Sequence, residues 1–418
     1  MASSSLTPAF DAELAKAVDD GIIGGAVLLA GDTTGNLNYA RAIGKATLDP
    51  SATANTDMQL DSILALASMT KLLTSVAVLQ LVERGVLRLD TDVAPYLPGL
   101  AAQPILTGFS EGGAPQYTAR TKPILVRHLL THSSGCGYGF ADARLGKWLE
   151  QQGLGGPGAA SSPVYGSVAE RYAWPLLFEP GTAWGYGCSS DWAGALVEAA
   201  GGATLDAHLQ AHVLAPLGIA PGAGVITFFP ERRGEGVLAR VADMTVRDGA
   251  AGRVGHGGAV FPRPTALPAD RSAYGGEGGY ADLSAYAKVL RSLLVDDGKL
   301  LAPATAELLF KPLLDPAARA WLNEKTLVHP EWIVGTVPHG VEYDYGAGGL
   351  LLDDDGTAEN HQHRKRGFLK WGGAWNLFWF IDRAAGAFGV FGSQVLPPAD
   401  PVVRPLIQAF EEALYSKL

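Results

Sequence analysis

The sequence has few cysteines, few charged residues and a shortage of positive charge. Only Cys136 and Cys188 occur among 418 residues, which is too few for a disulfide framework, so we expect two free thiols. Charged residues make up 18% of the chain, below the roughly one quarter that is usual, and the net charge is −10. An acidic balance of this kind argues against a surface that binds nucleic acid or an anionic membrane.

Long apolar runs are also missing. No run approaches the ~20 residues of a membrane-spanning helix, and residues 1–8 lack the basic and apolar regions of a secretory signal. We therefore expect a cytoplasmic protein without a membrane partner. Glycine, by contrast, is abundant: its 53 residues are about twice the average frequency and predict many turns and close backbone approaches. A chain of 418 residues exceeds the size of one core, which predicts two lobes.

Strand-like and helix-like patterns alternate unevenly along the chain. Thr7-Pro8 predicts the start of a helix. Further segments are expected as a hairpin (26–30 and 37–43), helices (122–131, 190–200, 282–294 and 401–415) and extended chain (346–352, 367–382 and 387–394). This order predicts an α/β lobe built from residues 1–86 and 275–418, with a mostly helical lobe from residues 87–274 between them.

The stretch Ser68-Met69-Thr70-Lys71 is the only Ser-x-x-Lys in the chain, and it opens an apolar segment, 72–82, typical of a buried helix. Residues three apart at a helix start lie on one face, so the hydroxyl and the amine can touch. Burial lowers the pKa of a lysine, which can then take the proton of a serine nucleophile. The alternative is an exposed Ser and Lys, because roughly one such spacing arises by chance in a chain this long.

Other motifs match a known pattern, but the residues around them do not form the structure that the pattern requires. The segment 108–112 matches Gly-x-Ser-x-Gly, but Gly-Gly-Ala-Pro follows, and a helix cannot start there, so Ser110 is expected in a loop. The glycines of 153–158 have dinucleotide-site spacing without the preceding strand. His361 and His363 lack a matching ligand cluster, which favours a solvated loop over a zinc site, and 353–356 is typical of a hairpin turn.

Two further segments support a site at Ser68. A turn at 180–188 presents Tyr186. An ammonium group beside a phenol favours the phenolate form, which can act as a general base. The alternative is that Tyr186 is a packed aromatic residue whose hydroxyl is already hydrogen-bonded. The second segment is Trp371-Gly372-Gly373, inside a strand-like run. Paired glycines there mark either a bulge or the close approach of a ligand or backbone. A backbone N–H at this place would complete an oxyanion hole with that of Ser68.

Taken together, these motifs resemble the serine β-lactamase and penicillin-binding-protein superfamily. Within it, the class C-like esterases (family VIII carboxylesterases) and the fungal lovastatin-type transesterases are the most similar. The resemblance covers nearly the whole chain through the stretches 35–39, 66–74, 82–85, 127–135, 180–182 with Tyr186, 190–194, 346–350 and 371–373. It implies an α/β (α+β) fold in which helices flank an antiparallel sheet, with an inserted all-helical lobe and the active site between the two.

The resemblance also implies roles for individual residues. Ser68 matches the family nucleophile, Lys71 the lysine that shares its proton, and Tyr186 the tyrosine of the second motif. The N–H groups of Ser68 and Ala374 match the oxyanion hole. Substrate-binding positions are expected at Tyr138, Cys188, Trp371, Gly372 and Gly373, and packing is the alternative role for Cys188. Neither a cofactor nor a metal ion is implied.

Two positions depart from the family pattern. Cys188 stands where β-lactamases usually carry Asn, and Trp371 stands where their third motif begins with Lys. That Lys directs positive charge toward the carboxylate of β-lactams and stem peptides, and the loss of such a charge-assisted contact costs about 1.5–3 kcal/mol. A cleft lined by an indole therefore favours a neutral, largely apolar ester.

The sequence thus predicts a serine carboxylesterase that cleaves neutral, largely apolar esters through a Ser68 acyl-enzyme. The same residues would serve an acyltransferase (transesterase) that moves an acyl group from an ester or thioester to an alcohol, with an acceptor alcohol or acyl carrier as second partner. A β-lactamase or DD-peptidase and a catalytically silent binding protein are further alternatives. All of these hypotheses involve small molecules and none involves nucleic acid.

Overall fold

The structure is a computed structural model of the chain, and it describes residues 5–52, 57–154, 166–220, 222, 224–249, 252–258, 263–328, 334–337, 340–354 and 363–418. The strands are β1 (Gly25–Asp32), β2 (Asn38–Gly44), β3 (Ile63–Ala65), β4 (Ile105–Phe109), β5 (Pro115–Thr118), β6 (Ile226–Thr227), β7 (Thr245–Arg247), β8 (Val254–His256), β9 (Tyr280–Asp282), β10 (Tyr343–Gly346), β11 (Gly349–Leu352), β12 (Leu369–Gly373), β13 (Leu377–Asp382), β14 (Ala387–Gly392) and β15 (Val395–Leu396). The α-helices are α1 (Pro8–Asp19), α2 (Thr70–Glu83), α3 (Pro98–Ala101), α4 (Val126–Leu130), α5 (Ala143–Gln151), α6 (Val168–Arg171), α7 (Ser189–Gly201), α8 (Leu205–Leu209), α9 (Glu235–Leu238), α10 (Leu283–Val295), α11 (Pro303–Ala306), α12 (Pro316–Val328) and α13 (Arg404–Tyr415). Short turns of other helix types are η1 (Ala67–Met69), η2 (Gln210–Leu214), η3 (Pro230–Arg232), η4 (Pro264–Ala266) and η5 (Glu307–Leu309).

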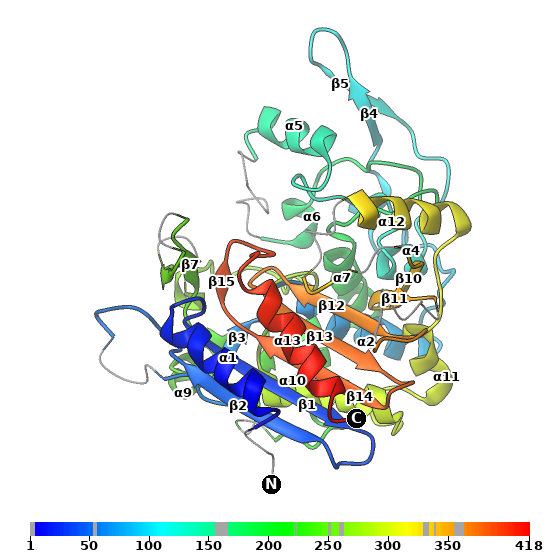
Figure 1. Cartoon of the computed structure of the whole chain (residues 1–418). Helices are drawn as coiled ribbons and strands as arrows, with labels where there is room; N and C mark the ends of the chain where they lie inside the picture. Colours follow the sequence, from blue (N-terminus) through cyan, green and yellow to red (C-terminus); the bar gives the residue numbers. More distant parts are fainter. Residues whose placement is uncertain are drawn as a thin grey trace.

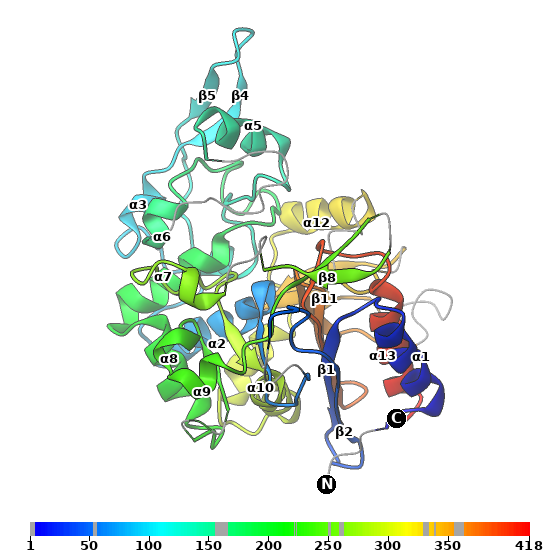
Figure 2. The same cartoon turned by 90° about the vertical axis from the view of Figure 1, so that its left-hand side faces the viewer.

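The main sheet joins the two ends of the chain. Within the described residues it has seven strands in the order β10-β11-β12-β13-β14-β1-β2, and every neighbouring pair is antiparallel. The helices α1 and α13 cover one face, while α10 and α2 lie on the other (Figures 1 and 2). The predicted class, an antiparallel sheet flanked by helices, is confirmed.

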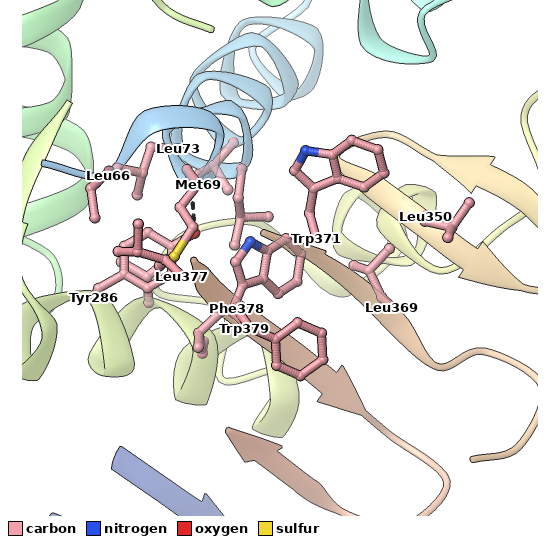
Figure 3. Packing of buried hydrophobic residues seen from close by; sticks show 14 of the residues in the cluster. Leu66, Met69, Leu73, Tyr286, Leu350, Leu369, Trp371, Leu377, Phe378 and Trp379 are labelled. Carbon is pink, nitrogen blue, oxygen red and sulfur yellow. Dashed lines mark hydrogen bonds between the residues drawn. The ribbon is translucent and has the colours of Figure 1, made fainter. Parts of the chain in front are cut away.

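The α2 helix runs through the core. Its residues from Thr70 to Leu81 are all buried, as the apolar segment 72–82 predicts. Figure 3 shows Leu66, Met69 and Leu73 at its start facing side chains of β13 and α10. The Tyr286 hydroxyl donates to the Met69 carbonyl at 2.9 Å. Packing of this kind fixes the start of α2 against the sheet.

Local signals set several element boundaries correctly. The Thr7 hydroxyl accepts from the Phe10 N–H at 3.2 Å, and Pro8 is the first residue of α1. Gly85 follows α2 at a φ of +72°, in the left-handed region that glycine adopts without strain. The hairpin β1–β2 and the helices α7, α10 and α13 also lie where the pattern predicts them.

Three segments differ from the prediction. The helix expected at 122–131 begins only at Val126, because residues 124 and 125 are held extended by bonds to Val93 and Asp92. The stretches 346–352 and 367–382, expected as extended chain, each contain a tight turn. The first holds the last residue of β10 and all of β11, and the second holds both β12 and β13.

Smaller sheets connect the middle of the chain to its ends. In the described residues β6 pairs with β9, which pairs with β3, and β7 pairs with β15 and β8. The β4–β5 hairpin instead projects from the end of the molecule away from the main sheet (Figures 1 and 2). The boundaries at residues 86 and 274 stay a prediction. None of the helices in the described part is long and apolar enough to cross a membrane.

Candidate active site

Ser68 lies in η1, immediately before α2. Its neighbour Ala67 has a φ of +44°, an unfavourable conformation for a residue with a Cβ, and such strain clusters at functional sites. The Thr70 hydroxyl stabilises this turn by donating to the Ala67 carbonyl at 2.6 Å and by accepting from the Gly279 N–H at 3.0 Å. The turn leaves Ser68 partly exposed while Lys71, one turn on, is 2% exposed.

The three side chains singled out in the sequence converge on one oxygen. Lys71 Nζ lies 3.0 Å from Ser68 Oγ, and the Tyr186 hydroxyl lies 2.6 Å from the same Oγ. Lys71 Nζ also donates to the Gly276 carbonyl at 2.7 Å and sits 4.9 Å from the centre of the Tyr186 ring. A hydroxyl with an amine and a phenol in contact can pass its proton to either, which is the arrangement that a serine nucleophile requires.

Aromatic side chains surround Tyr186. The ring centres of His132, Trp371 and Tyr138 lie 5.0, 5.3 and 5.4 Å from its own. Burial, and next the charge of Lys71, hold the pKa of His132 well below its usual value, so this imidazole is neutral. Burial raises the pKa of the Tyr138 phenol well above its usual value. The rings of His132, Tyr138 and Trp371, which we call the aromatic wall, are therefore uncharged, and all three are almost fully buried.

The two glycines after Trp371 mark close approaches of the chain to itself. A Cβ on Gly373 would lie 2.4 Å from the Leu66 carbonyl oxygen, and one on Gly372 would lie 2.6 Å from Val334 Cβ. The end of β12 thus lies directly against the segment that precedes Ser68. Ala374 begins the turn after β12 instead of lying within the strand, and it is partly exposed beside that segment.

The burial of Cys188 favours the packing role among the two that the sequence left open. The residue is 0% exposed, and its thiol faces Cys136, which is also buried. Burial raises the pKa of the Cys188 thiol well above its usual value, so the thiol is neutral and unreactive. Since it has no exposed surface for a substrate, we assign it to packing.

Replacement of Cys188 by alanine tests that assignment. We expect kcat/KM for an ester to stay within about twofold of wild type, and the free energy of unfolding to fall by about 1–2 kcal/mol because a small cavity forms. Ester kinetics and urea denaturation measure the two effects. A fall in kcat/KM of tenfold or more with normal stability would return Cys188 to the substrate site.

The remaining motifs lie elsewhere or outside the described residues. Ser110 sits in the turn of the β4–β5 hairpin, as expected for a loop serine, where its hydroxyl accepts from the Ala114 N–H at 3.1 Å. His363 stacks on Tyr415, and its partner His361 is outside the described residues, as are residues 155–158 and 355–356 of the other two motifs. No group of three or more His, Cys, Asp or Glu that could hold a metal ion occurs in the part of the chain that the structure describes.

The sequence analysis did not predict one segment of the site, residues 275–279. The segment Gly275-Gly276-Glu277-Gly278-Gly279 lies along the start of α2, where Thr74 and Lys71 donate to the carbonyls of Gly275 and Gly276, each at 2.7 Å. Asp191, in the first turn of α7, accepts from the Gly276 N–H at 2.9 Å. The density of glycines in this segment was an available signal, because such runs mark close backbone approaches.

The fold and the Ser-Lys-Tyr cluster together define a serine enzyme of the β-lactamase-like class, a group of acyl-enzyme formers. The Beta-lactamase family matches residues 10–412, and the chain belongs to that family. It is accordingly a serine hydrolase or acyltransferase acting on esters.

Characterised relatives cover almost the whole chain. Monacolin J acid methylbutanoyltransferase from Aspergillus terreus is 38% identical over 404 residues, which is 96% of this chain and 94% of the relative. Lovastatin esterase from Penicillium rubens is also 38% identical, over 97% of this chain and 98% of its own. The structure of unliganded simvastatin synthase from Aspergillus terreus superposes with a TM-score of 0.86 at 36% identity, and covers 99% of both chains.

Proposed function

We propose that the chain is an acyltransferase that moves an acyl group from a neutral ester or thioester to the hydroxyl of a largely apolar alcohol. The observation that carries this proposal is the contact of Ser68 Oγ with both Lys71 and Tyr186 beside an uncharged aromatic wall. The relatives that are named as methylbutanoyltransferases favour transfer over the hydrolysis that the sequence alone favours.

The proposed reaction has two matching halves. Ser68 Oγ attacks the carbonyl carbon of the donor while its proton passes to the Tyr186–Lys71 pair, and the N–H groups of Ser68 and Ala374 hold the oxyanion. The tetrahedral intermediate collapses, the bond to the leaving group breaks, and Tyr186 returns the proton to it. The acceptor hydroxyl then loses its proton to the same pair and attacks the acyl-Ser68 carbonyl. The bond between that carbonyl carbon and Ser68 Oγ breaks, the pair returns the proton to Oγ, and the new ester leaves.

The aromatic wall fits this substrate class. Trp371 brings no positive charge for a substrate carboxylate next to the reacting carbonyl. The rings of Trp371 and Tyr138 pack against that of Tyr186, so an acyl group on Ser68 would lie close to largely apolar side chains. An apolar alcohol in this place would also exclude the water that competes for the acyl-enzyme.

Hydrolysis of apolar esters is the second candidate. It uses every residue named above with water in place of the alcohol, and the lovastatin esterase of Penicillium rubens favours it. The two functions differ only in the fate of the acyl-enzyme, so a product analysis separates them.

Acceptor competition tests transfer directly. We expect p-nitrophenyl butyrate with added monacolin J acid or cyclohexanol to yield mainly the butyryl ester of one of these alcohols, with free butyrate as the minor product. Mass spectrometry of the products gives the ratio, and a reaction without enzyme is the control. Butyrate alone at every acceptor concentration would assign the chain to the esterases.

A further inference from the structure

The peptide group between Ala67 and Ser68 joins the strained turn to the proposed oxyanion hole. A trans peptide group is planar, so its N–H points away from its carbonyl, and the direction of one fixes the direction of the other. The Ser68 N–H is the proposed oxyanion donor, and the Ala67 carbonyl is the opposite end of the same group. Whatever holds this carbonyl therefore also aims the Ser68 N–H.

Thr70 holds the Ala67 carbonyl through two donors. Its hydroxyl donates to this oxygen at 2.6 Å, and its backbone N–H bonds to the same oxygen. Ala67 has a φ of +44°, so the peptide group is held in an orientation that the chain alone does not favour. Thr70 is 0% exposed, and bulk water therefore does not compete for the bond of its hydroxyl.

Gly279 fixes the direction of the Thr70 hydroxyl. The Gly279 N–H donates to Thr70 Oγ1 at 3.0 Å, so the hydroxyl hydrogen is left to point at the Ala67 carbonyl. A Cβ on Gly279 would lie only 2.8 Å from Oγ1, so glycine permits this approach. The Gly279 carbonyl accepts from the Leu66 N–H at 2.8 Å. The 275–279 segment thus supports the turn at both the hydroxyl and the residue before Ala67.

We propose that Thr70 is a positioning residue, whose hydroxyl fixes the Ala67–Ser68 peptide group so that the Ser68 N–H points at the oxyanion. The inference rests on the proposed function, because it concerns the same oxyanion hole. A donor that is already aimed stabilises the developing charge without first having to turn toward it. Since Thr70 has no exposed surface, it acts through Ser68 and does not contact the substrate.

Thr70→Val tests the role of the hydroxyl, because it keeps the branched shape of the side chain. We expect kcat/KM for p-nitrophenyl butyrate to fall about 10–50-fold, since the Ser68 N–H is no longer held toward the charge of the transition state. Thr70→Ser keeps the hydroxyl and should restore kcat/KM to within about threefold of wild type.

Pentyl trifluoromethyl ketone gives a second measurement that stability alone does not change. Ser68 Oγ adds to its carbonyl carbon, the Oγ proton passes to the Tyr186–Lys71 pair, and the carbonyl oxygen becomes an oxyanion held like that of the transition state. We expect the Ki of this ketone to rise in Thr70→Val by about the factor by which kcat/KM falls. A smaller fraction of folded enzyme would lower the rate without changing Ki.

Thr245→Val is the matched control. Thr245 is likewise buried, at 5% exposure, and its hydroxyl donates to a backbone carbonyl, that of Gln394, at 2.7 Å. It lies in β7, and this bond does not involve the Ser68 turn. We expect kcat/KM within about twofold of wild type and an unchanged Ki. Circular dichroism checks the folding of each variant, and Thr70→Ala repeats the test if Thr70→Val is unfolded.

The outcomes separate the hypotheses. A folded variant without the Thr70 hydroxyl whose kcat/KM stays within about twofold of wild type would overturn the proposal. A fall in kcat/KM without a rise in Ki, or a Thr70→Ser variant as slow as Thr70→Val, would overturn it too and assign Thr70 to packing. Failure of both Thr70→Val and Thr70→Ala to fold would likewise assign Thr70 to stability. If wild type and Ser68→Ala release p-nitrophenol equally, the proposed function itself fails, whatever the Thr70 variants do.

Discussion

Replacement of Ser68 by alanine is expected to lower kcat/KM for p-nitrophenyl butyrate by about 10⁴-fold or more. Lys71 and Tyr186 both contact the Oγ atom, and the proposed acyl-enzyme cannot form without it. Ser68 is partly exposed, and the turn is held by Thr70, so the variant should fold normally. Release of p-nitrophenol and intact-protein mass after incubation with substrate measure turnover and acylation.

Ser110→Ala is the matched control for Ser68. Ser110 is the serine of the chain's Gly-x-Ser-x-Gly stretch, and it sits in the projecting β4–β5 hairpin (Figure 1). We expect its variant to keep full activity and full acylation. Loss of activity in Ser110→Ala with retention in Ser68→Ala would show that the Ser-x-x-Lys spacing is a coincidence.

Replacement of Tyr186 by phenylalanine is expected to lower kcat/KM by about 10²–10³-fold. The change removes the hydroxyl that lies 2.6 Å from Ser68 Oγ and keeps the ring that packs on Trp371 and His132. Both halves of the reaction lose the group that passes a proton to or from oxygen. Pre-steady-state release of p-nitrophenol shows whether acylation and deacylation slow together.

Tyr345→Phe controls for the loss of a hydroxyl from the same aromatic cluster. The Tyr345 hydroxyl is buried and has no hydrogen-bond partner in the described residues, and its ring lies 5.5 Å from that of Trp371. Its removal should change kcat/KM by less than about twofold. Full activity in Tyr186→Phe would transfer the role of base to Lys71 alone.

The comparison of the sequence with the structure shows where local patterns suffice. The Ser68–Lys71 contact follows from a spacing of three residues at a helix start, and the structure places the two groups 3.0 Å apart. The glycines after Trp371 predict a close approach of a ligand or backbone, and the Leu66 carbonyl is that backbone. The turn at residues 374–376 was missed, although Asn376 was an available signal: it has a φ of +60°, in the left-handed region that asparagine tolerates in turns.

The buried position of Asp191 could not be predicted from the neighbouring residues in the sequence. In sequence it is an ordinary acidic residue in the first turn of α7, where a carboxylate is favourable. Its burial beside Gly276, and through it beside Lys71, depends on contacts with the 275–279 segment, 85 residues along the chain.

By itself, the sequence predicted Ser68 as the nucleophile, Lys71 beside it, the buried helix that follows and the strands that the two chain ends supply. The Ser68–Lys71 contact and these elements follow from spacing and apolar periodicity, while the catalytic roles follow from the family resemblance. The tertiary structure alone decided that Tyr186 meets Ser68 across 118 residues, that Cys188 is sealed in the interior and that Asp191 accepts a hydrogen bond from Gly276. The physical reason is that a side chain's partners and its exposure to water are fixed by the packing of segments distant in sequence, whereas periodicity reports only on neighbours within a turn or two.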